Sequence, residues 1–192
     1  MEKITFSEFY ESFDFKSDKG TTHDYINGYY SNEFTPIRTN KLKILEIGVH
    51  RGPSMKLLRD WFINSEITGI DPFGDGLPEG IADEIRSMGD ITIIQNDAYT
   101  QNVLDMFEDN SIDYLIDDGP HTLDSQLFAI EYWFKKVKVG GTMIIEDIQK
   151  LDTDTEKIDE LCFKLGLSYE IIDLRNNKNR YDDVLLIFKK NG

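Results

Sequence analysis

Residues 42–54 read LKILEIGVHRGPS, and this stretch decides the fold. Its first half is an apolar run of strand length, and Gly48 and Gly52 mark a turn directly after it. Pro53 suits the first position of a helix, because the N–H that proline lacks has no partner there. A strand, a glycine turn and a helix in this order predict one unit of an open α/β sheet.

The alternation of strand and helix continues along the chain. Six more apolar runs of strand length occur at residues 66–71, 91–97, 111–118, 142–148, 167–174 and 183–188. Helical spacing of apolar side chains lies between most of them, as in 53–62 and 123–138. Crossover helices join parallel strands, so we predict an α/β protein with a mostly parallel seven-stranded sheet and helices on both faces.

The last two predicted strands break this alternation. Only about eight residues, 175–182, connect them, which is too few for a crossover helix. We therefore expect the final strand to run antiparallel to the rest of the sheet.

Composition limits the classes of partner. The 192 residues suit one compact domain, and 36 acidic against 21 basic side chains give a formal net charge of −15. Such a field repels nucleic acid and anionic lipid, so we expect neither as a partner. The single cysteine, Cys162, lies in an apolar run and indicates a reducing compartment with core packing as its role.

The N-terminal sequence predicts no export. Residues 1–13 carry acids and lack the basic-then-apolar layout of a signal peptide, and no apolar run approaches the ~20 residues of a membrane span. We expect a cytoplasmic protein with no membrane partner.

Acidic residues stand at the ends of the first three predicted strands, where open α/β sheets bind ligands. Glu46 precedes Gly48 by two residues, and the glycine spacing fits neither a dinucleotide fingerprint nor a phosphate loop. Asp71 is placed to accept both hydroxyls of a ribose, and Asp97 to accept a hydrogen bond from an adenine amine. These acids suggest a nucleoside that bears a positively charged group.

Several motifs resemble one known class at this point. LEIGVHRG, GIDP, NDA and the final antiparallel hairpin look like the Rossmann-like S-adenosylmethionine-dependent methyltransferases. The resemblance implies strand order 3-2-1-4-5-7-6 in a domain over residues 41–192, and S-adenosylmethionine as cofactor. Carried over to this chain, the cofactor-binding residues are Glu46, Gly48, Gly52, Ser54, Asp71, Asp97, Ala98 and, as a neighbour of the cofactor or metal, Asp117.

A narrower resemblance rests on DKGTTH (18–23), IDDGPH (116–121) and IIEDI (144–148). These motifs are similar to the metal-dependent sugar O-methyltransferases that modify macrolide antibiotics, and to the related cephalosporin hydroxylases. The resemblance implies Asp118, Glu146 and Asp147 as ligands of Mg²⁺ or another divalent cation such as Mn²⁺, with His121 as general base. The family usually has serine where this chain has Pro120, and most relatives are longer.

The residues support this chemistry without the family. Three carboxylates at one sheet edge repel one another, and a hard cation such as Mg²⁺, Mn²⁺ or Ca²⁺ resolves the repulsion. The cation would orient a substrate hydroxyl and lower its pKa, so that His121 could remove the proton. In the alternative interpretation Asp118 caps the next helix, His121 is a surface residue, and Glu146 and Asp147 are loop acids.

The first forty residues predict an N-terminal helix and a covering segment. Lys19, His23 and Tyr25 are rich in contact-making groups, and in the resembling family this element covers cofactor and substrate. We predict a lid with substrate contacts, against the alternative of a helix that packs on the sheet or forms a dimer contact.

The predicted activity is O-methylation of a hydroxyl of a sugar or another small polyol-bearing substrate. The alternatives are a non-catalytic S-adenosylmethionine-binding protein and a hydroxylase-type activity on the same scaffold, for which no redox-cofactor motif occurs. The partner is then a small molecule or glycan, and a homo-oligomer is compatible with the family.

Overall fold

The computed structural model describes residues 4–74 and 79–192. Residues 1–3, at the start of the predicted covering segment, lie outside this description. The strands are β1 (Lys43–Ile47), β2 (Glu66–Asp71), β3 (Ile91–Gln95), β4 (Ile112–Asp117), β5 (Val137–Ile145), β6 (Glu170–Asp173) and β7 (Val184–Lys189).

Helices and single helical turns connect or precede these strands. They are α1 (Phe6–Ser12), α2 (Asp18–Thr21), the π-helix η1 (Ile26–Tyr30), α3 (Ser31–Phe34), the 3₁₀ turn η2 (Thr35–Ile37), α4 (Pro53–Trp61), α5 (Ile81–Arg86), α6 (Gln101–Leu104), α7 (Leu123–Glu131), the 3₁₀ turn η3 (Trp133–Lys135), α8 (Leu151–Leu165) and α9 (Arg175–Lys178).

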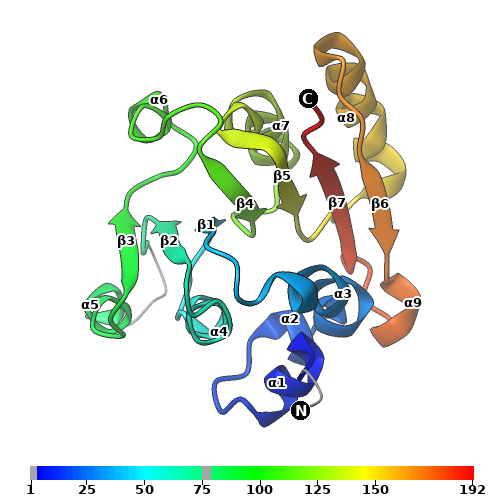
Figure 1. Cartoon of the computed structure of the whole chain (residues 1–192). Coiled ribbons are helices and arrows are strands. Elements are labelled where there is room, and N and C mark those ends of the chain that lie inside the picture. The colour runs from blue at the N-terminus through cyan, green and yellow to red at the C-terminus, as the bar shows by residue number, and fades with distance from the viewer. Residues whose placement is uncertain (1–3, 75–78) are drawn as a thin grey trace.

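The seven strands form one sheet in the order β3-β2-β1-β4-β5-β7-β6 (Figure 1). The first five strands are mutually parallel where they pair, and β7 runs antiparallel to both β5 and β6. Both the order and the antiparallel final strand are as predicted, and the short α9 lies in the connection between β6 and β7.

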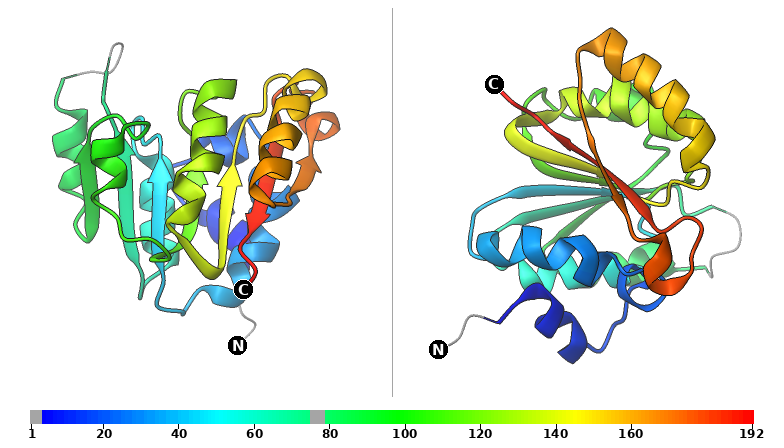
Figure 2. Two further views of the ribbon diagram at one scale, coloured as in Figure 1. Left: turned by 90° about the horizontal axis from the view of Figure 1, so that it is seen from above. Right: turned by 90° about the vertical axis from the view of Figure 1, so that its right-hand side faces the viewer.

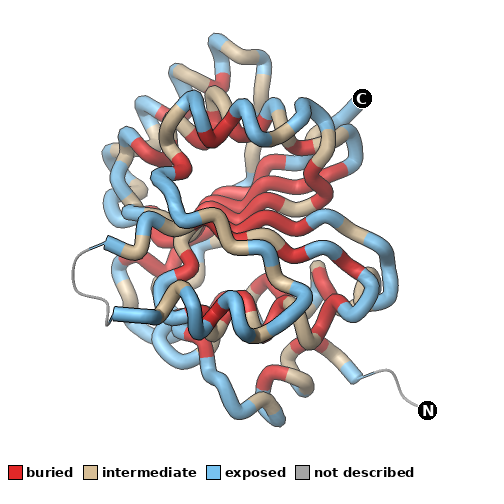
Figure 3. Tube along the Cα trace, turned by 90° about the vertical axis from the view of Figure 1, so that its left-hand side faces the viewer, coloured by how far each residue is buried: buried red, intermediate tan, exposed pale blue. Residues whose placement is uncertain are grey.

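Two layers of helices enclose the sheet (Figure 2). The hydrophobic cluster on one face includes side chains of α6, α7 and α8, and buries Cys162 as expected. The cluster on the other face includes α1, η1, α3, α4 and α5. The N-terminal segment is therefore part of the wall of the core, and the buried residues concentrate in the central strands (Figure 3).

Parallel register brings three strand ends to one level of the sheet. Ile47 of β1 pairs with Asp117 of β4, which pairs with Ile145 of β5. The residues that follow, Gly48, Asp118 and Glu146, therefore leave the sheet side by side. Since side chains alternate along a strand, Asp117 points toward the opposite face from its strand neighbour Ile116.

The structure corrects two predicted boundaries around β5. The predicted helix 123–138 ends at Glu131, and β5 begins at Val137, which pairs with Ile112 of β4. Pairing between strands far apart in sequence overrides the local helical spacing here. The predicted strand 142–148 ends at Ile145, because Asp147 adopts a left-handed backbone conformation with φ of 56°.

In the part of the chain that the structure describes, we find no helix that combines the length and the apolar composition needed to cross a membrane.

Candidate active site

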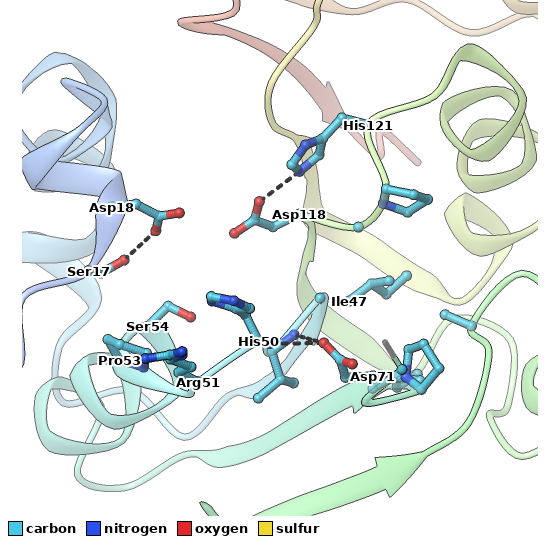
Figure 4. Close-up of a pocket in the computed structure, with 18 of the residues that line it drawn as sticks. Ser17, Asp18, Ile47, His50, Arg51, Pro53, Ser54, Asp71, Asp118 and His121 are labelled. Carbon is cyan, nitrogen blue, oxygen red and sulfur yellow. Dashed lines mark hydrogen bonds and ion pairs between the residues drawn. The ribbon is translucent and has the colours of Figure 1, made fainter. Parts of the chain in front are cut away.

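A pocket of about 940 Å³ opens beyond the carboxyl ends of β1, β2, β3 and β4 (Figure 4). Its wall includes seven of the residues predicted from sequence: Gly48, Ser54, Asp71, Asp97, Ala98, Asp118 and His121. Lys16, Ser17, Asp18 and Thr21 of the N-terminal segment complete the lining on another side. Five of the eight predicted cofactor residues and the predicted base thus share one cavity, whereas Glu46, Gly52 and Asp117 are not part of its lining.

The turn after β1 brings the backbone of two strands into close approach. Gly48 has φ of +85°, and a Cβ there would lie 1.8 Å from the carbonyl oxygen of Asp118. Glycine is therefore required at this position. Gly52 has φ of +83°, but a Cβ there would meet Ile85, so Gly52 serves the packing of α5 and lies outside the pocket lining.

Glu46 is completely buried next to this turn. It accepts a hydrogen bond from the Ser54 hydroxyl at 2.7 Å, and the Lys19 ammonium lies 3.2 Å from its other oxygen. Burial raises the pKa of Glu46 to about 7, although the charge of Lys19 opposes this shift.

Asp71 shapes the wall on which a ribose was predicted to bind. One of its oxygens accepts the backbone N–H groups of Val49 and His50 at 2.8 and 2.9 Å, and the other accepts the N–H of Phe73 at 2.6 Å. The carboxylate therefore holds the β1 turn in place beside the pocket (Figure 4).

The loop after β3 contributes Asp97 and Ala98. Asp97 accepts the N–H of Tyr99 at 2.9 Å, which makes a local turn. The Ala98 carbonyl accepts a hydrogen bond from the indole of Trp133 at 3.0 Å. Both residues line the pocket, and Trp133 anchors their loop to the core.

Asp118, His121 and Asp147 form a compact cluster at the pocket. Each offers one ligand atom, and these atoms lie within 4.8 Å of one another. His121 Nε2 is 3.0 Å from Asp118, as Figure 4 shows, and 3.4 Å from Asp147. Burial lowers the pKa of His121, but the hydrogen bond to Asp118 and the carboxylate charges outweigh burial and raise the pKa above its usual value.

Glu146, the third predicted metal ligand, is not a member of this triad within the described residues. It is buried, and its two oxygens are bound by the Lys19 ammonium at 2.8 Å and by the Tyr30 hydroxyl. Lys19 also contacts Asp118 at 2.6 Å. The ammonium therefore lies among carboxylates from the ends of β1, β4 and β5.

Lys19 remains charged in this environment. Burial lowers its pKa, but the charges of Asp118, Glu146 and Glu46 reverse the effect and raise the pKa well above its usual range. The residue therefore acts as a permanently charged internal cation, not as a base.

His23 and Tyr25 also face the acids. The Tyr25 hydroxyl donates to Asp147 at 2.6 Å, and the His23 ring stacks on Tyr25 with centroids 4.8 Å apart. His23 Nδ1 lies 3.4 Å from Asp147 and 3.5 Å from Asp183. Both side chains are buried, so they contact the acid loops directly.

Asp117 turns away from the Asp118 cluster. Its Oδ1 accepts the Tyr99 hydroxyl and the N–H of Gly119, and burial raises its pKa to about 6. Tyr99 and Asp183 had no predicted role. Tyr99 could have been found from its position directly after NDA, whereas Asp183 carries no local signal.

The donor set suits a hard divalent cation. The carboxylates of Asp118 and Asp147, with further acids beside them, match Mg²⁺ or Mn²⁺ better than a thiolate-seeking metal, and the His121 imidazole lies next to these oxygen ligands. The pocket also has the size and the strand-end position of a nucleoside site in an open α/β sheet.

Comparison with known proteins agrees with this geometry. A family described as "Methyltransferase domain" matches residues 45–148. The 8-demethyl-8-(2-methoxy-alpha-L-rhamnosyl)-tetracenomycin-C 3'-O-methyltransferase of Streptomyces olivaceus is 30% identical over 140 residues, which cover 69% of this chain and 34% of that protein. The corresponding 2'-O-methyltransferase of the same organism is 27% identical over 143 residues, covering 69% of this chain and 35% of that protein.

The chain thus spans about a third of the length of these curated relatives. Among solved structures, the MycE methyltransferase from the mycinamycin biosynthetic pathway, in complex with Mg and SAH, superposes with a TM-score of 0.71 at 20% identity. The superposition covers 99% of this chain and 55% of that one. The fold is the Rossmann-like methyltransferase fold, and the chain belongs to the methyltransferase domain family.

Proposed function

We propose that the protein is an S-adenosylmethionine- and Mg²⁺-dependent O-methyltransferase that acts on a hydroxyl of a sugar or another small polyol. The observation that carries the proposal is the cluster of Asp118, His121 and Asp147, of which Asp118 and His121 line the same pocket as Gly48 and Asp71. A base, a cation-binding acid set and a nucleoside pocket are the parts that this reaction needs.

The comparisons support the choice of cofactor and acceptor. The two Streptomyces relatives are named for O-methylation of rhamnosyl groups, and MycE was solved with Mg and SAH. In this chain the turn after β1, Asp71 and the Asp97–Ala98 loop would hold the cofactor. Asp118 and Asp147 would hold the metal, with Glu146 completing the set if Lys19 moves aside.

The chemistry divides between the bound groups and the chain. When bound, S-adenosylmethionine supplies the methyl group, and the divalent cation lowers the pKa of the acceptor hydroxyl. His121, acting as the neutral imidazole, takes the hydroxyl proton, and the neighbouring carboxylates of Asp118 and Asp147 stabilise the imidazolium that results. The enclosing loops orient the acceptor, so positioning supplies much of the rate.

The segment of residues 1–40 would cover the methyltransferase domain of residues 41–192. Lys19, His23 and Tyr25 reach from this segment to the acids after β4 and β5. We assign to it the closing of the pocket over cofactor and acceptor, with Ser17 and Asp18 on the inner surface.

Replacement of His121 by alanine tests the proposal. As general base, His121 contributes on the order of 10²–10⁴-fold to the rate, so His121→Ala should lose methyl transfer by that factor. Binding of S-adenosylhomocysteine, measured by calorimetry, should remain within a few-fold of the wild type, and so should the Mn²⁺ affinity.

Asp124→Ala is the matched control, because Asp124 is exposed three residues farther along the same connection. Its methyl transfer should equal that of the wild type. Unchanged turnover in His121→Ala would contradict the base assignment. Loss of Mn²⁺ binding would instead make His121 a metal ligand.

A further inference from the structure

Two loops line the pocket and contact each other. The loop after β3 contributes Asp97, Ala98 and Tyr99, and the loop after β4 contributes Asp118 and His121. In the proposed function the first loop holds the adenine end of the cofactor, and the second holds the metal and the base. Any contact between the loops therefore connects two binding events.

Tyr99 and Asp117 make such a contact. The Tyr99 hydroxyl donates to Asp117 Oδ1, which also accepts the N–H of Gly119 at 3.3 Å. Asp117 is 3% exposed, and its Oδ2 has no hydrogen-bond partner within the described residues. Because Asp117 is buried from solvent, the hydrogen bonds of its carboxylate are those with Tyr99 and Gly119 in the described residues.

The backbone of the acid loop is shaped around the tyrosine. A Cβ at Gly119 would lie 2.0 Å from the Tyr99 hydroxyl oxygen. Any larger residue at position 119 would displace the ring, so the absence of a side chain creates the space for this contact. The next residue but one, His121, has φ of 56°, an unfavourable conformation that its surroundings must hold.

Two further hydrogen bonds hold the loop after β3, one to the core and one within the loop. The Trp133 indole binds the Ala98 carbonyl at 3.0 Å, and Thr100 donates to the Asp97 carbonyl at 2.9 Å. The Tyr99 hydroxyl connects this anchored loop to the loop after β4, through Asp117 Oδ1 and the Gly119 N–H. A shift of Tyr99 would therefore also move Gly119 and the strained His121 that follows it.

We propose that Tyr99 and Asp117 are positioning residues that couple cofactor binding to metal binding, by holding the two loops in one mutual arrangement. The inference rests on the proposed function. Binding of the adenine group of the cofactor stabilises the loop after β3. Through Tyr99 and Asp117, the stabilised loop then favours the arrangement of Asp118 and His121 in which the cation binds. Linkage makes the effect reciprocal.

Tyr99→Phe tests the coupling, because it removes one hydroxyl and leaves the ring. The dissociation constant of S-adenosylhomocysteine is measured by calorimetry in EDTA and in saturating MgCl₂. For the wild type we expect Mg²⁺ to tighten binding by about 5-fold or more, as for a typical coupling. In Tyr99→Phe the ratio of the two constants should fall to about 2 or less.

The ratio of the dissociation constants in EDTA and in MgCl₂ distinguishes a positioning role from a general loss of structure. A purely structural defect raises both dissociation constants by the same factor and leaves their ratio unchanged. Tyr132→Phe is the matched control, because Tyr132 is half-buried and forms no side-chain hydrogen bond in the described structure; it should keep the wild-type ratio. In Asp117→Asn the amide oxygen still accepts a hydrogen bond from the Tyr99 hydroxyl, so this variant should also keep most of the wild-type ratio.

The results for the variant and the wild type test the coupling and the proposed function separately. The coupling alone would be overturned if Tyr99→Phe kept the ratio of the wild type, or if the wild type bound S-adenosylhomocysteine equally well with and without Mg²⁺. Failure of the wild type to bind S-adenosylhomocysteine under either condition would overturn the proposed function itself. If Tyr99→Phe does not fold, Asp117→Ala cuts the same hydrogen bond from the other side, with the same expected ratio.

Discussion

Lys19 carries the charge balance of the acid cluster. Its ammonium lies 2.6–3.2 Å from carboxylates on three strand ends, and it is separated from Asp118 and Glu146 by 99 and 127 residues in sequence. Asp118 and His121, three residues apart, could be paired from the sequence alone. The contacts of Lys19 with Asp118 and Glu146 could not be predicted from the sequence, because only folding brings these distant residues together.

Lys19→Met should strongly destabilise the metal-free protein. Loss of the ammonium leaves buried carboxylates uncompensated, which costs about 3–5 kcal/mol of unfolding free energy. Urea denaturation in EDTA measures this loss. Added MgCl₂ should raise the stability of the variant more than that of the wild type, because the cation then supplies the missing charge.

The surface pair Lys56–Asp60 provides the control. Lys56→Met should cost less than about 1 kcal/mol, since partly exposed pairs contribute little. A Lys19→Met protein as stable as the wild type in EDTA would show that the ammonium does not balance the cluster.

Tyr25→Phe should weaken metal binding without unfolding the protein. The Tyr25 hydroxyl donates to Asp147 at 2.6 Å, and loss of a hydrogen bond that orients a ligand costs about 10-fold or more in metal affinity. A Mn²⁺ titration followed by electron paramagnetic resonance measures the affinity. Tyr181→Phe, at an exposed tyrosine, should leave it unchanged; equal affinities for both variants would exclude an orienting role for Tyr25.

The turn from β1 to α4 was the most predictable element. Its glycines, its proline and its apolar strand all lie within 42–54, so local chemistry specifies it. The start of β5 was not predictable, because pairing of Val137 with Ile112 competes with helical spacing and wins only in the assembled sheet. Alternation along β4 likewise separated Asp117 from Asp118, but it could not name Tyr99 as the partner.

Gly48→Ala and Gly80→Ala should differ sharply in stability. Both glycines have nearly the same φ, +85° and +87°, but a Cβ at Gly48 would meet the Asp118 backbone at 1.8 Å, whereas one at Gly80 meets nothing within 4 Å. We expect a cost of about 1–2 kcal/mol for Gly80→Ala from backbone strain alone. Gly48→Ala should cost several kcal/mol more, as seen by chemical denaturation; similar costs would mean that the two strand ends separate easily.

At the scale of the whole molecule, part of the excess of acids is buried at the sheet edge beside the pocket. The chain has a formal net charge of −15, and buried members of that excess line the sheet edge: Glu46, Asp117, Glu146 and Asp147. Composition predicts the acidity of the chain. It indicates neither that these four acids are buried nor that an internal lysine lies beside Glu46 and Glu146.

The metal-free protein should lose stability as the pH rises toward neutrality. Burial raises the pKa of Asp117 to about 6 and that of Glu46 to about 7, so the folded state binds more protons than the unfolded state between about pH 4 and 7. Stability therefore falls across this window. In EDTA, the thermal midpoint should be higher at about pH 5.5 than at about pH 7.5, by roughly 5 °C.

Glu46→Gln removes one of the titrating groups and should reduce this difference between the two midpoints. A midpoint that is higher at the upper pH would show that these acids are ionised in the folded protein.

Calorimetric titration with S-adenosylhomocysteine, with and without Mg²⁺, tests the proposed function most directly. We predict binding of one molecule per chain, strengthened by Mg²⁺, and its loss in Gly48→Ala at temperatures where that variant remains folded. No heat of binding to the wild type under either condition would contradict the assignment of the pocket to this cofactor.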